Sequence, residues 1–187
     1  MADTRTQILE IAERLIRTRG YSGFSYAGIA EVVGTSKAAI HHYFPSKVDL
    51  GSALLDQTSQ DLQAHLNSGP QTDSIAMLKH YFKIFELSIL GEQVCLCGML
   101  MAENDGLPDA LRLKNKRLVD WQIQWLEDVF NRGREANELH FPGSPLSEAE
   151  FIYGAAQGLH IVAKMRNDVQ SFKQSMQQLI DRYGRLH

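Results

Sequence analysis

The chain has no long hydrophobic run and only two cysteines among its 187 residues. No apolar stretch approaches the roughly 20 residues that a membrane-spanning helix needs. The first ten residues, MADTRTQILE, lack the apolar segment of a signal peptide. We therefore expect a cytoplasmic protein without a membrane partner. Cys95 and Cys97 are one residue apart, which is a poor spacing for a structural disulfide.

The short motifs of common enzyme classes are also missing. The sequence contains no Gly-rich phosphate loop, no HExxH, no GxSxG and no paired CxxC. His41 and His42 are adjacent, so on a helix they lie on neighbouring faces and are poorly placed for joint ligation or catalysis. We predict that the chain is not an enzyme and that it uses no metal and no cofactor.

Basic charge is not in excess, because the formal net charge is −3 at pH 7. The balance is uneven along the chain. Residues 1–50 have six Lys/Arg against five Asp/Glu, whereas residues 51–187 have thirteen against seventeen. Binding to nucleic acid would therefore depend on one local face and not on the bulk charge of the protein.

Helical periodicity dominates the sequence, and strand-like alternation is missing, so we predict an all-α fold of about nine helices. Thr4 and Gln7 have capping-box spacing at the first helix, and Gly20 ends it. Ser25, Ser36 and Ser46 are the predicted N-caps of the next three helices. The predicted helices cover about 4–19, 25–33, 36–43, 46–67, 74–90, 94–104, a long segment from 108, 147–166 and 168–183.

The segment TSKAAIHHYFPSK, Thr35 to Lys47, contains no acidic residue. It forms the second of two short helices joined by a turn at Gly34, which is the pattern of a helix-turn-helix. The second helix of that motif enters the major groove of DNA. Ile40 and Phe44 would face the core of the module. Lys37 and His41 could donate hydrogen bonds to base edges, and Ala38 would allow close approach.

The residues from Ser25 to Leu50 resemble the signature of the TetR family of bacterial transcriptional regulators. The shared positions include Gly34 and Ser36 of the turn and the ending Tyr43-Phe44-x-x-Lys47, while Thr35 replaces the usual valine. Ala38 replaces the usual glycine and His41 the usual tyrosine, so the sequence leaves the base preference open. The resemblance implies that Lys37, Ala38 and His41 contact base edges. It implies DNA-backbone contacts for Ser25, Tyr26, Ala39, His42, Tyr43 and Lys47.

The resemblance further implies a helix-turn-helix DNA-binding domain over 4–64 and a larger helical domain for ligand binding and dimerisation over 68–187. The expected partners are a double-stranded DNA operator, a second copy of the chain, and a small-molecule ligand or electrophile. Repression is the usual mode of the family, although the sequence leaves activation open. The alternative is a helical protein-interaction adaptor that does not bind DNA.

Small residues recur every three or four positions in Phe151 to Met165, which favours close packing of two helices. Packing within one chain is the alternative to a dimer contact. Because family members pair through their last two helices, we expect a homodimer. The predicted interface residues are Phe151, Gly154, Ala155, Gly158, Val162, Phe172, Met176 and Leu179.

Aromatic residues of the middle helices are candidates for a ligand pocket, or else plain core residues. Trp121 and Trp125 are one helical turn apart and are the leading pair, joined by Tyr81 and Phe85. The segment VCLCGMLMAE, Val94 to Glu103, resembles a stretch of the TetR-family subgroup that includes electrophile-sensing repressors. Cys95 is thus a candidate sensor with Cys97 as a resolving thiol, or else a small buried residue.

Overall fold

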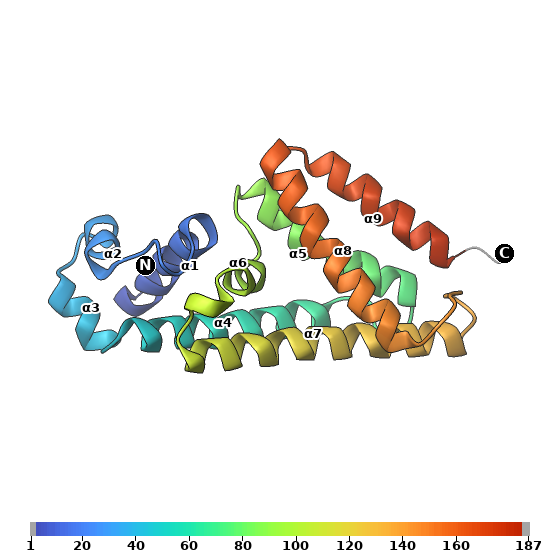
Figure 1. Ribbon diagram of the computed structural model, residues 1–187, viewed down its shortest axis with the longest axis horizontal. Helices are drawn as coiled ribbons and strands as arrows, with labels where there is room; N and C mark the ends of the chain where they lie inside the picture. The colour runs from blue at the N-terminus through green and yellow to red at the C-terminus, as the bar shows by residue number, and fades with distance from the viewer. Residues whose placement is uncertain (1–2, 185–187) are drawn as a thin grey trace. The chain divides into compact units, whose positions relative to one another are not determined.

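The computed structural model describes residues 3–184, and within this range it contains nine α-helices, one 3-10 helix and no β-strand (Figure 1). The predicted all-α fold is therefore confirmed. The helices are α1 (Thr4–Arg19), α2 (Tyr26–Val33), α3 (Lys37–Tyr43), α4 (Lys47–Ser68), α5 (Ser74–Leu90), α6 (Leu96–Ala102), η1 (Asn104–Gly106), α7 (Asp109–Glu135), α8 (Pro145–Arg166) and α9 (Val169–Tyr183).

Local capping explains most of the helix boundaries. The Ser25 and Ser36 hydroxyls accept hydrogen bonds from Gly28 N and Ala39 N, so they cap α2 and α3 as predicted. Ser46 and Asp49 cap α4 reciprocally, with Ser46 N donating to Asp49 Oδ2 at 2.9 Å. The first cap differs from the prediction, because the Asp3 carboxylate, and not Thr4, accepts from Thr6 N.

Packing divides the chain into two compact units. The first comprises the residues up to Asp61 together with Leu96–Leu118, and the second comprises Leu62–Cys95 and the residues from Val119 onward. Helices α4 and α7 each contribute one part to each unit. Residues 96–118 thus pack with the N-terminal helices, although they lie beyond the boundary predicted at 64–68. The assignment of functions to the two predicted ranges stays a prediction.

The core of the first unit consists of side chains from α1 to α4 that are fully buried, among them Ile8, Ile16, Ile29, Ile40 and Leu50. In this unit α1 packs on α2 and α6, and α2 packs on α3. The Lys114 ammonium of α7 also binds α4, at 2.7 Å from Asp56 Oδ2 and 2.6 Å from Ser52 Oγ. The first unit is therefore held by apolar packing and by polar contacts between α4 and α7.

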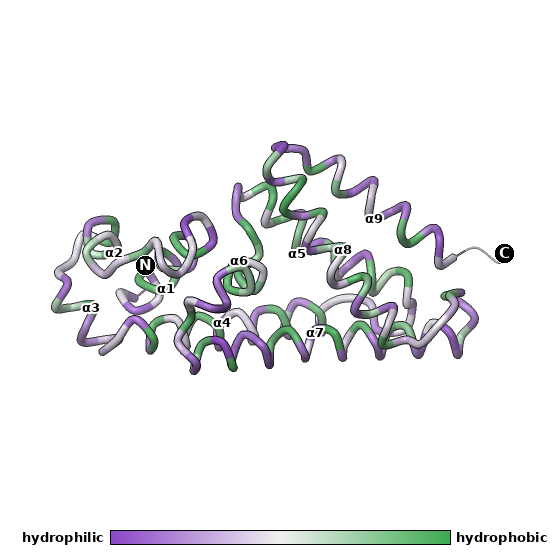
Figure 2. The backbone as a smooth tube through the Cα atoms, in the orientation of Figure 1, coloured by the Kyte–Doolittle hydropathy of each residue, from purple (hydrophilic) through white to green (hydrophobic). Residues whose placement is uncertain are grey.

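In the second unit, α5 packs against both α8 and α9. Its core is rich in aromatic rings, namely Tyr81, Phe82, Phe85, Phe130 and Phe172. Hydrophobic and hydrophilic stretches alternate along α9 (Figure 2), as expected of a helix that buries one stripe. No helix among residues 3–184 is long and apolar enough to cross a membrane.

Candidate functional site

The turn between α2 and α3 places two short helices side by side. Gly34 ends α2 with φ +74°, a left-handed conformation that favours glycine. Both Gly34 N and Thr35 N donate to Ala30 O at 3.0 Å, which closes the end of α2. Ser36 then begins α3 at once. The chain therefore forms the predicted helix-turn-helix.

Helix α3 has one buried side and one exposed side. Ile40 is fully buried, and Phe44 just beyond the helix is 3% exposed. The exposed residues are the predicted base-reading and flanking positions, Lys37, Ala38, His41, His42 and Tyr43. Ser25 is exposed at the start of α2, and Ala39 is half-buried. The structure thus brings a cationic and polar face to the surface, with no acidic side chain on α3 itself.

Tyr26, a predicted DNA-backbone contact, is only 6% exposed. Its hydroxyl donates to Phe44 O at 2.8 Å, and its ring packs edge-on against His41, with centroids 4.6 Å apart. Burial, with a smaller contribution from Asp49, raises the pKa of Tyr26 to about 12. This geometry favours a role for Tyr26 in holding the end of α3 in place.

His41 has one ring nitrogen engaged, because Nδ1 lies 3.2 Å from Pro45 O. A carbonyl oxygen can only accept, so Nδ1 carries the hydrogen. In the neutral ring Nε2 is then an acceptor, which differs from the donor role expected from the sequence.

Lys47 is half-buried, with its ammonium 4.2 Å from the centre of the Phe24 ring and 4.6 Å from that of Tyr21. Burial lowers the pKa of Lys47, and the nearby Glu103 carboxylate opposes that shift. The amine is therefore held by cation–π contacts within its own unit. A phosphate contact by Lys47 would compete with these contacts.

Glu103, which follows α6, joins that helix to the turn after α1. Its Oε2 accepts from Ser22 N at 3.0 Å. The approach is so close that a Cβ at Gly20, where φ is +80°, would collide with the Glu103 carboxylate. Sequence reasoning missed this link, because nothing in the local pattern pairs positions 20–22 with 103.

The two cysteines have different surroundings, and neither forms a disulfide. Cys95 is half-buried in the loop before α6, and its Sγ accepts from Gln157 Nε2 at 3.6 Å. Cys97 is 2% exposed within α6, where its carbonyl accepts from Asn115 Nδ2 at 3.3 Å. Cys95 is therefore the more accessible of the two cysteines.

The predicted aromatic pocket residues lie in the core of the second unit. Tyr81 is fully buried and Phe85 is 2% exposed, while Trp121 and Trp125 are half-buried. Trp125 stacks on Tyr81, with centroids 5.8 Å apart, and the Tyr81 hydroxyl donates to Gln122 Oε1 at 3.3 Å. For Tyr81 and Phe85 this geometry favours the core alternative.

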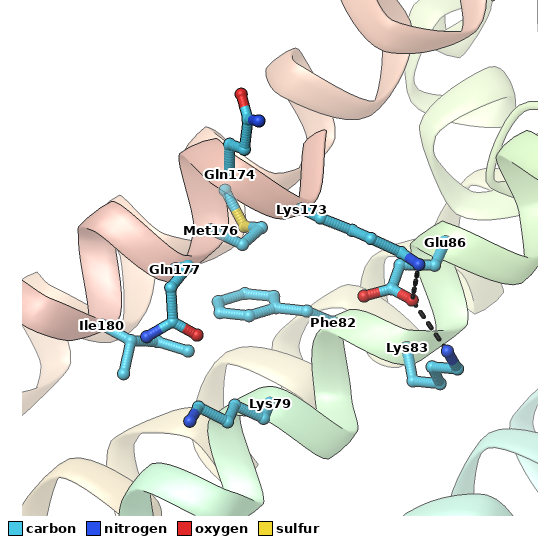
Figure 3. Close-up of a pocket in the computed structure, with 9 residues that line it drawn as sticks. All are labelled: Lys79, Phe82, Lys83, Glu86, Lys173, Gln174, Met176, Gln177 and Ile180. Carbon is cyan, nitrogen blue, oxygen red and sulfur yellow. Dashed lines mark hydrogen bonds and ion pairs between the residues drawn. The ribbon is translucent and has the colours of Figure 1, made fainter. Parts of the chain in front are cut away.

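An open groove of about 490 Å³ lies between α5 and α9. Figure 3 shows Glu86 between Lys83 and Lys173, at 2.8 and 3.6 Å from the two ammonium groups. The other residues that line the groove are Lys79, Phe82, Gln174, Met176, Gln177 and Ile180. None of the predicted pocket residues lines this groove.

Helix α8 exposes an apolar stripe on the side opposite its buried face. Phe151 is 55% exposed and Val162 is 38% exposed. A Cβ on Gly154 or Gly158 would meet no atom within 4 Å. Packing within one chain therefore does not explain these glycines. Sequence reasoning missed Ile161 and Met165, 48% and 75% exposed, although they continue the same spacing.

Two of the predicted interface residues on α9 are buried in their own chain, which is a correction to the sequence-based assignment. Phe172 is 1% exposed and Met176 is 3% exposed. Phe172 packs against Phe85, with ring centroids 5.9 Å apart. Leu179 and Ala155 are half-buried and remain candidates. Helical periodicity identifies an apolar stripe, but not whether another helix of the same chain covers it.

Comparison with known proteins places this geometry in a family. Residues 8–54 match the family model of the bacterial regulatory proteins of the tetR family. A solved transcriptional regulator of the TetR family from Agrobacterium tumefaciens superposes with a TM-score of 0.92 at 30% identity, covering 97% of both chains.

A second relative is the HTH-type transcriptional repressor NemR of Escherichia coli, which is 26% identical over 180 residues, covering 93% of this chain and 90% of NemR. A crystal structure of NemR in its reduced form has a TM-score of 0.78 at 25% identity, covering 97% of each chain. The chain belongs to the TetR family of bacterial regulatory proteins.

Proposed function

We propose that the protein is a transcriptional repressor whose helix α3 reads the major groove of a palindromic DNA operator. The observation that carries this proposal is the exposed face of α3, which presents Lys37, Ala38 and His41 and has no acidic residue. Lys37 contacts a base edge as a cationic donor, and Ala38 allows the backbone to approach. His42 and Tyr43 contact the DNA backbone.

The repressor acts as a homodimer. A two-fold operator requires two reading helices, and one short helix makes few contacts. The exposed stripe of α8 supports this assembly, because Gly154 and Gly158 leave room for a second helix to approach closely. The α8 contact centres on Phe151, Gly158 and Val162, and α9 contributes Leu179.

The signal is a covalent reaction at Cys95 with an electrophile or oxidant, which releases the operator. Three observations support this role. Cys95 forms no disulfide, it is only half-buried, and it immediately precedes α6. The alternative signal is a reversible ligand near Trp121 and Trp125.

Glu103 relays the signal within the first unit. Helix α6 begins at the residue after Cys95, and Glu103 follows its last turn. Since the Glu103 carboxylate accepts from Ser22 N, a displacement of α6 pulls directly on the connection between α1 and α2. The relay thus needs a movement of one short helix and no rearrangement of α3 itself.

DNA selection followed by binding measurements tests the proposal. Duplexes selected from a random pool should contain inverted repeats, and N-ethylmaleimide should release them from the unmodified protein. Cys95→Ser should bind the same duplexes and resist release, whereas Cys97→Ser should respond like the unmodified protein. Release of DNA from Cys95→Ser at the same dose would place the signal elsewhere, and failure to select any duplex would favour the adaptor alternative.

A further inference from the structure

The side chain of Gln157 lies on the sulfur of Cys95. Its amide Nε2–H donates to Cys95 Sγ at 3.6 Å, within the range of a hydrogen bond to sulfur. Gln157 projects from the buried face of α8 and is 7% exposed. A buried amide therefore lies beside the thiol of a half-buried cysteine.

The other end of the same amide has no partner. Gln157 Oε1 is a buried oxygen without a hydrogen bond among residues 3–184. Leaving a buried acceptor unsatisfied costs free energy, and hydrocarbon side chains would fill the space without that cost. An oxygen in this position is explained if a molecule that arrives at the sulfur brings a hydrogen-bond donor.

The donor end of the amide acts on the reactivity of the sulfur. A thiolate accepts a hydrogen bond more strongly than a neutral thiol does, because its charge is localised on the sulfur. The Gln157 N–H therefore favours the thiolate form of Cys95, which is the nucleophilic form.

We propose that Cys95 and Gln157 together form a reactive-thiol site for electrophiles that carry an N–H or O–H group next to the reacting carbon. Gln157 is the positioning residue: its N–H stabilises the thiolate, and its Oε1 accepts a hydrogen bond from the reagent. This inference rests on the proposed role of Cys95 as the reacting residue.

The site has a donor half, which is the Gln157 N–H on the thiolate, and an acceptor half, which is Gln157 Oε1 facing the reagent. Iodoacetamide is a suitable probe for both halves. The Cys95 proton first passes to water, and the thiolate electron pair then forms an S–C bond as the C–I bond breaks and iodide leaves. The amide N–H of the reagent donates to Gln157 Oε1 during the attack. Methyl iodoacetate is nearly the same size and reacts at the same kind of carbon, but it has no N–H.

The pH profile of alkylation tests the donor half. The rate at Cys95, measured by mass spectrometry of the intact protein without DNA, should rise with pH along a titration curve. Gln157→Leu should move the midpoint upward by about one pH unit, because one hydrogen bond to a charged group is lost. An unmoved midpoint overturns the donor half.

The ratio of the two reagent rates tests the acceptor half, since the thiolate fraction cancels at a fixed pH. Relative to free cysteine, the unmodified protein should favour iodoacetamide over methyl iodoacetate by about 2- to 10-fold, the range expected of one neutral hydrogen bond. Gln157→Leu should return the ratio to that of free cysteine. A ratio equal to free cysteine in the unmodified protein overturns the acceptor half.

Two further variants keep the test interpretable. Gln157→Glu has nearly the same shape, removes the N–H and retains acceptors, so the midpoint should rise while the preference for iodoacetamide persists. Gln122→Leu removes another buried glutamine, 4% exposed, which contacts Tyr81 and should leave both readouts unchanged. Equal effects from Gln122→Leu and Gln157→Leu would overturn the assignment to Gln157.

The alkylation test of the Cys95–Gln157 site can fail or succeed independently of the DNA-release test of the proposed function, because the alkylation rates are measured without DNA. If N-ethylmaleimide does not release operator DNA but the Gln157 variants shift the alkylation profile, the reactive site stands and the signalling role fails. If release occurs and the Gln157 variants change nothing, the signalling role stands without this site.

Discussion

One ring nitrogen of His41, Nδ1, is hydrogen-bonded within the protein, and this determines which DNA bases the other nitrogen, Nε2, can bind. Since Nδ1–H donates to Pro45 O, Nε2 of the neutral ring is an acceptor, and His41 is an exposed residue of α3. In the major groove the hydrogen-bond donors are the amino groups of cytosine and adenine. His41 should therefore prefer one of these two bases.

We predict that His41→Ala relaxes the preference for cytosine or adenine at one position in each half-site, at a loss of about 1–3 kcal/mol for the preferred base. Selection of binding sites from a random pool with both proteins measures this. His42→Ala is the matched control and should weaken all duplexes equally. A preference of the unmodified protein for guanine at that position would contradict the assigned tautomer.

The residues of α3 that face outward could be predicted from spacing alone, because Ile40 and Phe44 define the inner side of a short helix. The partners of Tyr26 and Lys47 could not. Tyr26 bonds to Phe44 O, 18 residues away, and the Lys47 ammonium lies over rings from the turn that precedes α2. Such contacts depend on how the helices pack, and the local sequence does not predict that packing.

At the scale of whole helices, α8 and α9 differ in whether their apolar stripes are covered by other helices of the same chain. The buried face of α8 contacts α5 and α9, and its outer stripe carries Gly154 and Gly158. Helix α9 has a single apolar stripe, including Phe172, which packs on its own chain. Periodicity predicted both stripes but could not distinguish the covered one from the open one.

We predict that two substitutions at Gly158 change different properties, namely the stability of the chain and the stability of the dimer. Because its Cβ position is open within the chain, Gly158→Ala should raise helix stability by up to about 1 kcal/mol in a dissociated chain. Gly158→Leu should instead force two α8 helices apart and weaken the dimer. Analytical ultracentrifugation over a range of concentrations measures the dimer, and thermal unfolding measures stability. An unchanged dimer in Gly158→Leu would exclude this face as the interface.

The link from Glu103 to Ser22 N makes a prediction about communication along α6. Glu103→Ala should leave N-ethylmaleimide free to modify Cys95 but should reduce the release of DNA, since the displaced helix no longer pulls on the turn after α1. Mass spectrometry of the adduct and fluorescence anisotropy of labelled operator, on the same samples, separate the two steps.

Asp105→Ala is the control for that experiment, because Asp105 is an exposed acidic residue in η1 and has no bond to the α1–α2 turn among the interactions described above. It should respond like the unmodified protein. Full release of DNA from Glu103→Ala at equal modification would mean that the signal travels by another route.

At the scale of the whole molecule, a chain with a formal net charge of −3 must bind a polyanion through a small part of its surface. The affinity should then depend strongly on salt through a few contacts, each of which displaces counterions from the DNA. In a dimer every such contact occurs twice, so a single substitution per chain removes two charges from the complex.

Lys47 is the lysine predicted to contact the DNA backbone, so we predict that Lys47→Ala reduces the slope of log affinity against log salt concentration by about two, one for each chain of the dimer. The measurement is fluorescence anisotropy of a selected operator at several salt concentrations, with both proteins held above the dimer dissociation constant. Lys79→Ala removes an exposed lysine of α5 in the groove toward α9 and should leave the slope unchanged. A change of about one for Lys47→Ala would indicate that a single copy binds the DNA. No change would mean that the Lys47 ammonium stays on the Phe24 and Tyr21 rings and contacts no phosphate.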